Sequence, residues 1–279
     1  RVLGEEGAAV EITDEVLGVY FILIGLFKKA VISDYISLNF VDRIFDNPTL
    51  YSGLENLLGV YGYALQIYCD FSGYSDMAIG IALLLGFHFP INFNAPYRSV
   101  SITDFWRRWH ISLSTWIRDY IYISLGGNRK GKLRQYVNLV ITMLLGGLWH
   151  GASLNFVAWG GAHGLALAVH KFFRQEVLHH GRSFQSHGVR KWIAIVLTFH
   201  FVCFTWIFFR QKTFTAGWTM LRQIFFNFHA ELWQQVCAGY QYVLAFMAFG
   251  YLTHFLPDAW QEGIIAQLRR CNVVVYALL

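Results

Sequence analysis

The sequence predicts an all-α membrane protein, a bundle in which several helices cross the bilayer. Three observations favour this fold class. Hydrophobic residues make up 56% of the 279 positions, and charged residues only 14%, well below the roughly 25% of an average soluble domain. Mean hydropathy is positive, at +0.40. The basic residues lie beside the apolar runs, as they do at the ends of membrane helices, and no nucleic-acid-binding motif accompanies them.

The first apolar run, Val16–Ile32, contains Lys28 and Lys29 near its end. We interpret this pair as a helix end on the cytoplasmic side, where lysine and arginine are enriched. Later runs of similar character are Trp192–Phe209, Tyr242–Leu256 and the start of one at Asn272–Leu279. Because the chain opens on Arg1 and stops within this last run, we expect it to be part of a longer protein.

Two further spans are predicted at Gly53–Cys69 and Ser75–Phe89, separated by a short polar stretch that carries Asp70 and Asp76. One interpretation places the two carboxylates in a wet loop between helices. The other places them in a functional site, because acidic residues at membrane depth are costly and are usually functional. The residues alone leave both possibilities open.

The segment Ser101–Gly126 is rich in aromatic residues and arginines, and its spacing predicts one amphipathic helix that lies at the membrane interface or re-enters from it. Packing is the simpler explanation of its aromatic face. Members of that face are Phe105, Trp109, Leu113, Trp116 and Tyr120. A basic glycine-rich turn, Gly126–Lys132, follows and lacks the pattern of a phosphate-binding loop.

The centre of the chain is the stretch Tyr136–His170, two apolar runs joined by a turn that contains His150 between glycine-rich segments. No carboxylate occurs from Gly131 to Gln175. The run Val137–Trp149 reaches about 20 Å as a helix, less than the roughly 30 Å hydrocarbon core, so we expect His150 at depth in the membrane.

Two roles for His150 remain open at this point. A histidine is a suitable general base near neutral pH, because its unperturbed pKa is about 6.5. Alternatively, the ring is structural and donates to a backbone carbonyl where the helix breaks. Any carboxylate that orients His150 has to come from outside the hairpin. The nearest in sequence are Asp70, Asp76, Asp104 and Asp119.

The other histidines give weaker signals. His110 alone is typical of an interfacial histidine. His163 and His170 share a helix face, but without an acidic ligand or a His-Glu-x-x-His pattern we predict no metal site. No serine lies in a Gly-x-Ser-x-Gly turn, so a hydrolase triad is not indicated. The four cysteines are widely spaced and are expected to be free thiols.

Four blocks of sequence closely resemble the membrane-bound O-acyltransferase family, within it the branch that acetylates alginate and other polysaccharides. The blocks occur in the family's order: Tyr68–Gly80, Asn92–Tyr97, Phe105–Ser114 continuing to Gly126–Arg129, and Gly147–Ala152. The resemblance implies that residues 1–279 form one membrane domain around a central tunnel, with core motifs at 68–170 and without the family's N-terminal helices.

By this resemblance, the family's essential histidine falls on His150 and its second motif histidine on His110. The donor would be acetyl-CoA, used as a co-substrate with no bound cofactor. The partners would be a periplasmic acetyltransferase and a polysaccharide acceptor, at the bacterial inner membrane. Five basic residues could attract coenzyme A phosphates or serve only as positive-inside anchors: Arg107, Arg108, Arg118, Arg129 and Lys130.

Two other classes of function stay open in the sequence. A transporter or flippase would line its pathway with the same buried histidines, although no internal repeat is present. A scaffold subunit would only recruit a periplasmic enzyme. Release of free coenzyme A from acetyl-CoA would distinguish an acyltransferase from both.

Overall fold

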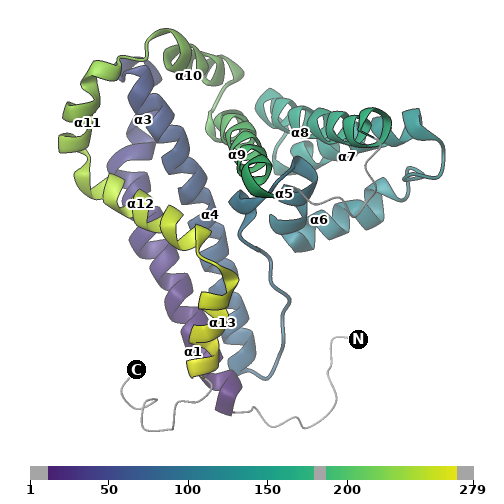
Figure 1. Cartoon of the computed structure of the whole chain (residues 1–279), viewed down its shortest axis with the longest axis horizontal. Coiled ribbons are helices and arrows are strands. Elements are labelled where there is room, and N and C mark those ends of the chain that lie inside the picture. The colour runs from purple at the N-terminus through teal and green to yellow at the C-terminus, as the bar shows by residue number, and fades with distance from the viewer. Residues whose placement is uncertain (1–11, 179–186, 269–279) are drawn as a thin grey trace. The chain divides into compact units, whose positions relative to one another are not determined.

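A computed structural model describes residues 12–178 and 187–268, which form helices and loops without a strand (Figure 1). This confirms the all-α prediction. The chain divides into two compact units. Unit 1 comprises Arg1–Asn39, Leu65–Asn92 and Tyr242–Leu279, and unit 2 comprises Phe40–Ala64 and Phe93–Gln241. The apolar run predicted at Asn272–Leu279 lies outside the described residues, as does Cys271.

Two helices in the described residues are long and apolar enough to cross a membrane, Asp14–Asp46 and Gly188–Arg210. A third is added if Ala230–Gly239 and Gln241–Phe255, which are bent by 94° at their junction, form one broken span. Helix α9 (Gly188–Arg210) confirms the span predicted at Trp192–Phe209. The first segment of this pair contains η7 (Ala230–Leu232) and α11 (Trp233–Gly239), and the second is α12 (Gln241–Phe255).

The helix end predicted at Lys28 and Lys29 is wrong, because the helical run continues to Asp46. The lysines lie in a π-helical turn, and carboxylates satisfy both ammonium groups. Successive parts of the run are α1 (Ile12–Leu26), η1 (Phe27–Ser33), α2 (Asp34–Ile36), η2 (Ser37–Val41) and α3 (Asp42–Asp46).

The two spans predicted on either side of Asp70 and Asp76 are in fact one helix, α4 (Gly53–Leu84). The loop interpretation is therefore wrong. Both aspartates pair with lysines of η1: Asp70 lies 2.5 Å from Lys29, and Asp76 lies 2.7 Å from Lys28. Charge neutralisation within the helix pair removes the need for a wet loop.

In unit 1, α1 and α4 run antiparallel and pack through glycines (Figure 1). A Cβ atom on Gly25 would lie 2.5 Å from the carbonyl oxygen of Gly73, and one on Gly73 would lie 2.6 Å from that of Gly25. Gly18 and Gly80 make the same reciprocal contact seven residues away on each helix. Only glycine permits such a close backbone approach. Helix α13 (Asp258–Leu268) also contacts α1.

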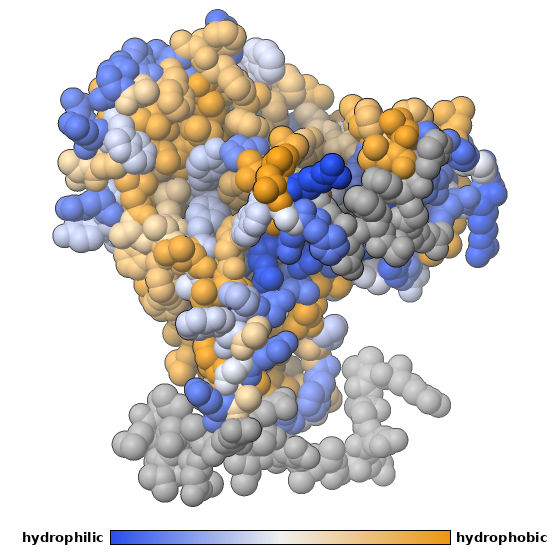
Figure 2. All heavy atoms as spheres, viewed as in Figure 1, coloured by the Kyte–Doolittle hydropathy of each residue, from blue (hydrophilic) through white to orange (hydrophobic). Residues whose placement is uncertain are grey.

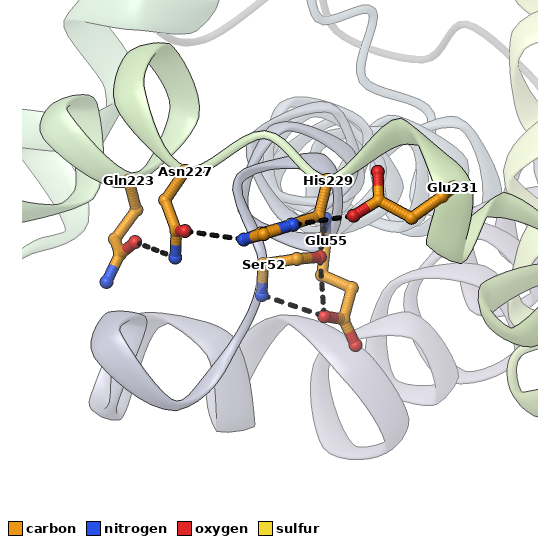
Figure 3. Close-up of polar contacts among 6 residues, drawn as sticks. All are labelled: Ser52, Glu55, Gln223, Asn227, His229 and Glu231. Carbon is orange, nitrogen blue, oxygen red and sulfur yellow. Dashed lines mark hydrogen bonds and ion pairs between the residues drawn. The ribbon is translucent and has the colours of Figure 1, made fainter.

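In unit 2, a capping box starts α4. The Ser52 N–H and hydroxyl both donate to the Glu55 carboxylate, at 2.9 and 2.7 Å, and the Glu55 N–H donates back to the Ser52 hydroxyl at 3.3 Å (Figure 3). This capping box adjoins the loop between α10 (Phe214–Phe226) and η7 (Ala230–Leu232). In that loop, the carbonyl oxygen of Asn227 accepts a hydrogen bond from the N–H of Gly53. Side-chain bonds from His229 to Asn227 and Glu231 hold this loop (Figure 3).

The hairpin predicted around His150 lies in unit 2 and is confirmed. It consists of α7 (Lys132–His150) and α8 (Leu154–Phe172), which run antiparallel (Figure 1). Glycines bring the two backbones together. A Cβ atom on Gly147 would collide with the carbonyl oxygen of Phe156, and one on Gly160 with that of Met143. The remaining short helices of this unit are η3 (Pro48–Leu50), η4 (Pro96–Arg98), α5 (Ile102–Arg108), α6 (Ile111–Ile117), η5 (Arg118–Tyr122) and η6 (Phe173–Val177).

Apolar residues cover much of the visible surface (Figure 2). On α9, one exposed stretch contains Trp192, Ile193, Val196 and Leu197, each at least half exposed. Large contiguous apolar surfaces are rare on soluble monomers and are expected where side chains face lipid. The surface of α9 therefore agrees with its assignment as a membrane span.

Candidate active site

His150 is the last residue of α7, at the turn of the central hairpin. The helix ends there because Gly151 is extended (φ 163°, ψ 152°), while its N–H still donates to the carbonyl oxygen of Leu148 at 3.2 Å. The N–H of Ser153 donates to the carbonyl oxygen of Gly151, which closes the turn. A short glycine turn thus places the imidazole at the end of a helix and next to the start of α8.

An aromatic box surrounds the half-buried ring of His150, formed by Phe156, Trp159 and Phe209. The ring centres of these residues lie 6.1, 5.4 and 5.0 Å from that of His150, and Trp149 adds an edge contact at 4.9 Å. Within the described parts of the chain, the His150 imidazole makes no hydrogen bond. The structural interpretation, in which the ring donates to a backbone carbonyl, is therefore not met, and its nitrogens remain available to a substrate.

His110 lies between α5 and α6, where it adopts a left-handed backbone conformation (φ 44°, ψ 59°). This break contradicts the single helix predicted over Ser101–Gly126. Residues other than glycine rarely adopt this conformation, which costs about 1–3 kcal/mol and concentrates at functional sites. The ring of His110 stacks on Phe93, and its Nδ1 lies 3.4 Å from the hydroxyl of Ser112.

The structure places His110 and His150 close enough within unit 2 to interact electrostatically. His110 lies outside the helices that are long enough to span a membrane. Burial, with a smaller contribution from the charge of nearby His150, lowers the pKa of His110 to about 4. His110 is therefore neutral near pH 7, and an N–H of its ring can donate a hydrogen bond beside the imidazole of His150.

None of the four aspartates considered as partners of His150 makes a hydrogen bond or ion pair with it. Asp104 pairs with Arg108 at 3.0 Å, and Asp119 pairs with Arg118 at 2.7 Å. The other two, Asp70 and Asp76, pair with lysines in unit 1. Aromatic packing, rather than a carboxylate, orients the imidazole of His150.

The five predicted coenzyme A residues fall into two groups. Arg108 and Arg118 are engaged by the neighbouring carboxylates of Asp104 and Asp119. The other three are exposed and form no ion pair with the described residues: Arg107, Arg129 and Lys130. The turn that carries Arg129 and Lys130 is shaped by glycines with positive φ at Gly126, Gly127 and Gly131. The exposed group offers free positive charge to an anionic ligand.

The two histidines of α8 contact hydrogen-bonding side chains of other helices. His163 bonds to Trp106 and Thr205, and His170 lies 3.1 Å from the hydroxyl of Thr103. Over residues 12–178 and 187–268, no group of three or more metal-ligating side chains gathers. The described cysteines Cys69, Cys203 and Cys237 are free thiols, as predicted.

The aromatic box around His150 was not predicted from the sequence. Phe156 and Trp159 are three residues apart and therefore share a face of α8, which is a usable signal. Phe209 is 59 residues beyond His150 and carries no local signal of its contact with that ring. It reaches His150 because α9 packs against α8.

The comparison with known protein families agrees with a helical membrane fold. The model of the membrane-bound O-acyltransferase family matches residues 16–205, and the chain belongs to this family. The match confirms the resemblance seen in the four sequence blocks.

Several curated proteins are similar to this chain. A peptidoglycan O-acetyltransferase of Helicobacter pylori is 45% identical over 213 residues, which cover 74% of this chain and 38% of that protein. The probable alginate O-acetylase AlgI of Pseudomonas aeruginosa is 47% identical over 203 residues, 72% of this chain and 37% of that protein. A teichoic acid D-alanyltransferase of Bacillus subtilis is 33% identical over 209 residues, 71% of this chain and 51% of that protein. The chain thus spans well under two thirds of the length of these relatives.

Proposed function

We propose that this chain forms the acyl-transfer core of a membrane O-acetyltransferase, which moves an acetyl group from a thioester donor toward a hydroxyl of an extracellular or cell-wall glycan. The observation that carries the proposal is the imidazole of His150, which lacks a hydrogen bond within the described residues and sits in an aromatic box beside His110. Family membership and the names of the O-acetylating relatives support the same reaction class.

In the proposed reaction, His150 acts as the general base. The acceptor hydroxyl oxygen attacks the thioester carbonyl carbon, so that a C–O bond forms and the C–S bond breaks. The hydroxyl proton passes to the imidazole of His150 and then to the leaving thiolate, which departs as free thiol. The box of Phe156, Trp159 and Phe209 limits the access of water to the imidazole, which favours transfer to the acceptor hydroxyl over hydrolysis of the thioester.

His110 helps to position the acceptor or stabilises the negative charge that develops on the carbonyl oxygen. A neutral imidazole donates one hydrogen bond without adding a full charge, which suits an oxyanion. Its strained backbone conformation supports a functional role, because such conformations persist where the surrounding structure enforces them.

The donor in this proposal is acetyl-CoA on the cytoplasmic side. Exposed Arg107, Arg129 and Lys130 would attract its phosphates, while Arg108 and Arg118, paired with carboxylates, would contribute less. The protein would be a multi-pass component of the bacterial inner membrane, and a periplasmic acetyltransferase would deliver the acetyl group to the polysaccharide.

The test is release of free coenzyme A from acetyl-CoA by the whole protein in native membrane vesicles, which retain the acceptor that the reaction requires. We expect His150→Ala to lower the rate by about 10²–10⁴-fold, the usual contribution of a general base, without lowering the amount of protein in the membrane. His187→Ala is the matched control, because His187 is exposed just before α9. Full activity in His150→Ala would refute the role of His150. Transport of acetyl-CoA or glycan without thioester cleavage would refute the acyltransferase itself.

A further inference from the structure

His163 is a fully buried histidine on α8 that the proposed reaction does not use. Its ring links three helices of unit 2. The indole N–H of Trp106, on α5, donates to Nδ1 of His163 at 3.3 Å. On the other side of the ring, Nε2 lies 2.9 Å from the hydroxyl oxygen of Thr205, on α9.

The hydrogen bonds of Thr205 fix where the proton of His163 resides. The Thr205 hydroxyl donates its only hydrogen to the carbonyl oxygen of Val202 at 2.8 Å, so it accepts from Nε2–H of His163. Nδ1 is then the acceptor for Trp106. A neutral ring protonated at Nε2 satisfies every partner, whereas a second proton on Nδ1 would break the bond to Trp106. His163 is therefore a fixed connector and not a proton carrier.

Two tryptophans link the connector to the histidines of the candidate active site. Trp159, one turn before His163 on α8, contacts the rings of His163 and His150 at 5.0 and 5.4 Å. Trp106, one turn before His110, belongs to the helix whose end sets the left-handed conformation of His110. The ring of His163 is therefore connected through Trp159 to His150 and through Trp106 to the helix that precedes His110.

We propose that His163 is a positioning residue for acyl transfer: the chain Trp106–His163–Thr205 holds α5 and Trp159 so that His110 and His150 face the same reacting atoms. This inference rests on the proposed function. It assigns to a buried histidine a role in the geometry of the site and none in the movement of protons.

The first test compares His163→Leu with His163→Gln in the coenzyme A release assay, using acetyl-CoA and the whole protein in membrane vesicles. Leucine removes both hydrogen bonds. Glutamine offers one acceptor and one donor, and can restore the bonds to Trp106 and Thr205. Because small displacements of reacting groups cost up to about 100-fold in rate, we expect kcat to fall at least about tenfold in His163→Leu. The KM for acetyl-CoA should be unchanged, and glutamine should recover most of kcat.

Two more conservative variants remove the hydrogen bonds of His163 while leaving its own side chain in place. Trp106→Phe keeps an aromatic ring but loses the N–H, and Thr205→Val keeps the shape but loses the hydroxyl. We expect both to lower kcat, and we expect the effect of Trp106→Phe to be small when His163 is already leucine, because the bond is gone. Thr205→Ser, which keeps the hydroxyl, is the control and should stay within about threefold of wild type.

The possible outcomes separate this inference from the proposed function. Wild-type kcat in His163→Leu, or in both Trp106→Phe and Thr205→Val, would overturn the positioning role alone. A loss of kcat in His163→Leu that only parallels a loss of folded protein, with no recovery in His163→Gln, would also overturn it. Absence of coenzyme A release by wild type would refute the proposed function, and the positioning role with it.

Discussion

The ammonium nitrogen of Lys28 lies 2.7 Å from a carboxylate oxygen of Asp76, and both side chains are largely buried between η1 and α4. The ring of Tyr68 covers the ammonium at 5.9 Å. Breaking a buried pair leaves one charge uncompensated, which costs about 3–5 kcal/mol. We therefore expect Lys28→Met and Asp76→Asn each to lower the yield of folded protein and its midpoint of thermal unfolding in detergent.

The control for this pair is Lys212→Met, because Lys212 and Asp46 form a pair with side chains 81% and 49% exposed. Exposed pairs contribute about 0–1 kcal/mol, so this variant should unfold close to wild type. The exchange Lys28→Asp with Asp76→Lys should recover part of the loss. Equal stability of all single variants would contradict a stabilising role for the Lys28–Asp76 pair.

The central hairpin provides a sharp test of backbone packing. A Cβ atom on Gly160 would collide with the carbonyl oxygen of Met143, whereas one on the next residue, Gly161, would meet only the end of the Leu144 side chain at 3.4 Å. We expect Gly160→Ala to destabilise the protein by about 1–3 kcal/mol and Gly161→Ala to be tolerated. Thermal unfolding of the two variants checks this, and similar midpoints would show that α7 and α8 are not in close backbone contact.

Strain and function can be separated at His110. Glycine adopts the left-handed conformation freely, so His110→Gly should keep or raise the stability, by up to about 1 kcal/mol. The same variant should release coenzyme A at least about tenfold more slowly, because the imidazole is lost. Measuring unfolding and activity on one preparation gives both results. Activity equal to wild type would exclude a catalytic contribution from the His110 ring.

The capping box at the start of α4 should contribute measurably to stability. Ser52→Ala removes the hydroxyl that accepts the N–H of Glu55, at a cost of about 1 kcal/mol, while Ser52→Thr preserves it. When the protein is unfolded in detergent with increasing SDS, the midpoint for Ser52→Ala should be lower than the midpoints for wild type and for Ser52→Thr. If Ser52→Thr were as unstable as Ser52→Ala, loss of the hydroxyl could not be the cause.

Local patterns in the sequence were sufficient to predict the hairpin around His150, the membrane span at α9 and the family. Each depends on short-range signals: a glycine turn between apolar runs, a long uncharged segment, or motifs in order. The helix through Asp70 and Asp76 was missed because the interpretation treated each charge by itself. Pairing with Lys28 and Lys29, more than 40 residues away, makes those aspartates compatible with a continuous helix.

The break at His110 could not be predicted either, since the spacing of Ser101–Gly126 fits one helix throughout. Tertiary packing decides it: Trp109 packs against Phe93 and Trp206, which come from distant parts of the chain, and the backbone turns to allow this. The aromatic box of His150 was missed for the same reason, because Phe209 lies on another helix.

The reciprocal glycine contacts of unit 1 also constrain how this protein can evolve. Gly18 opposes Gly80, and Gly25 opposes Gly73, so the two contact glycines are seven residues apart on each helix. One inserted residue between Gly18 and Gly25 would rotate the remainder of α1 by about 100° and put a bulky side chain where two backbones now touch. Homologues of different length should therefore carry their insertions and deletions in the loops and not in this part of α1.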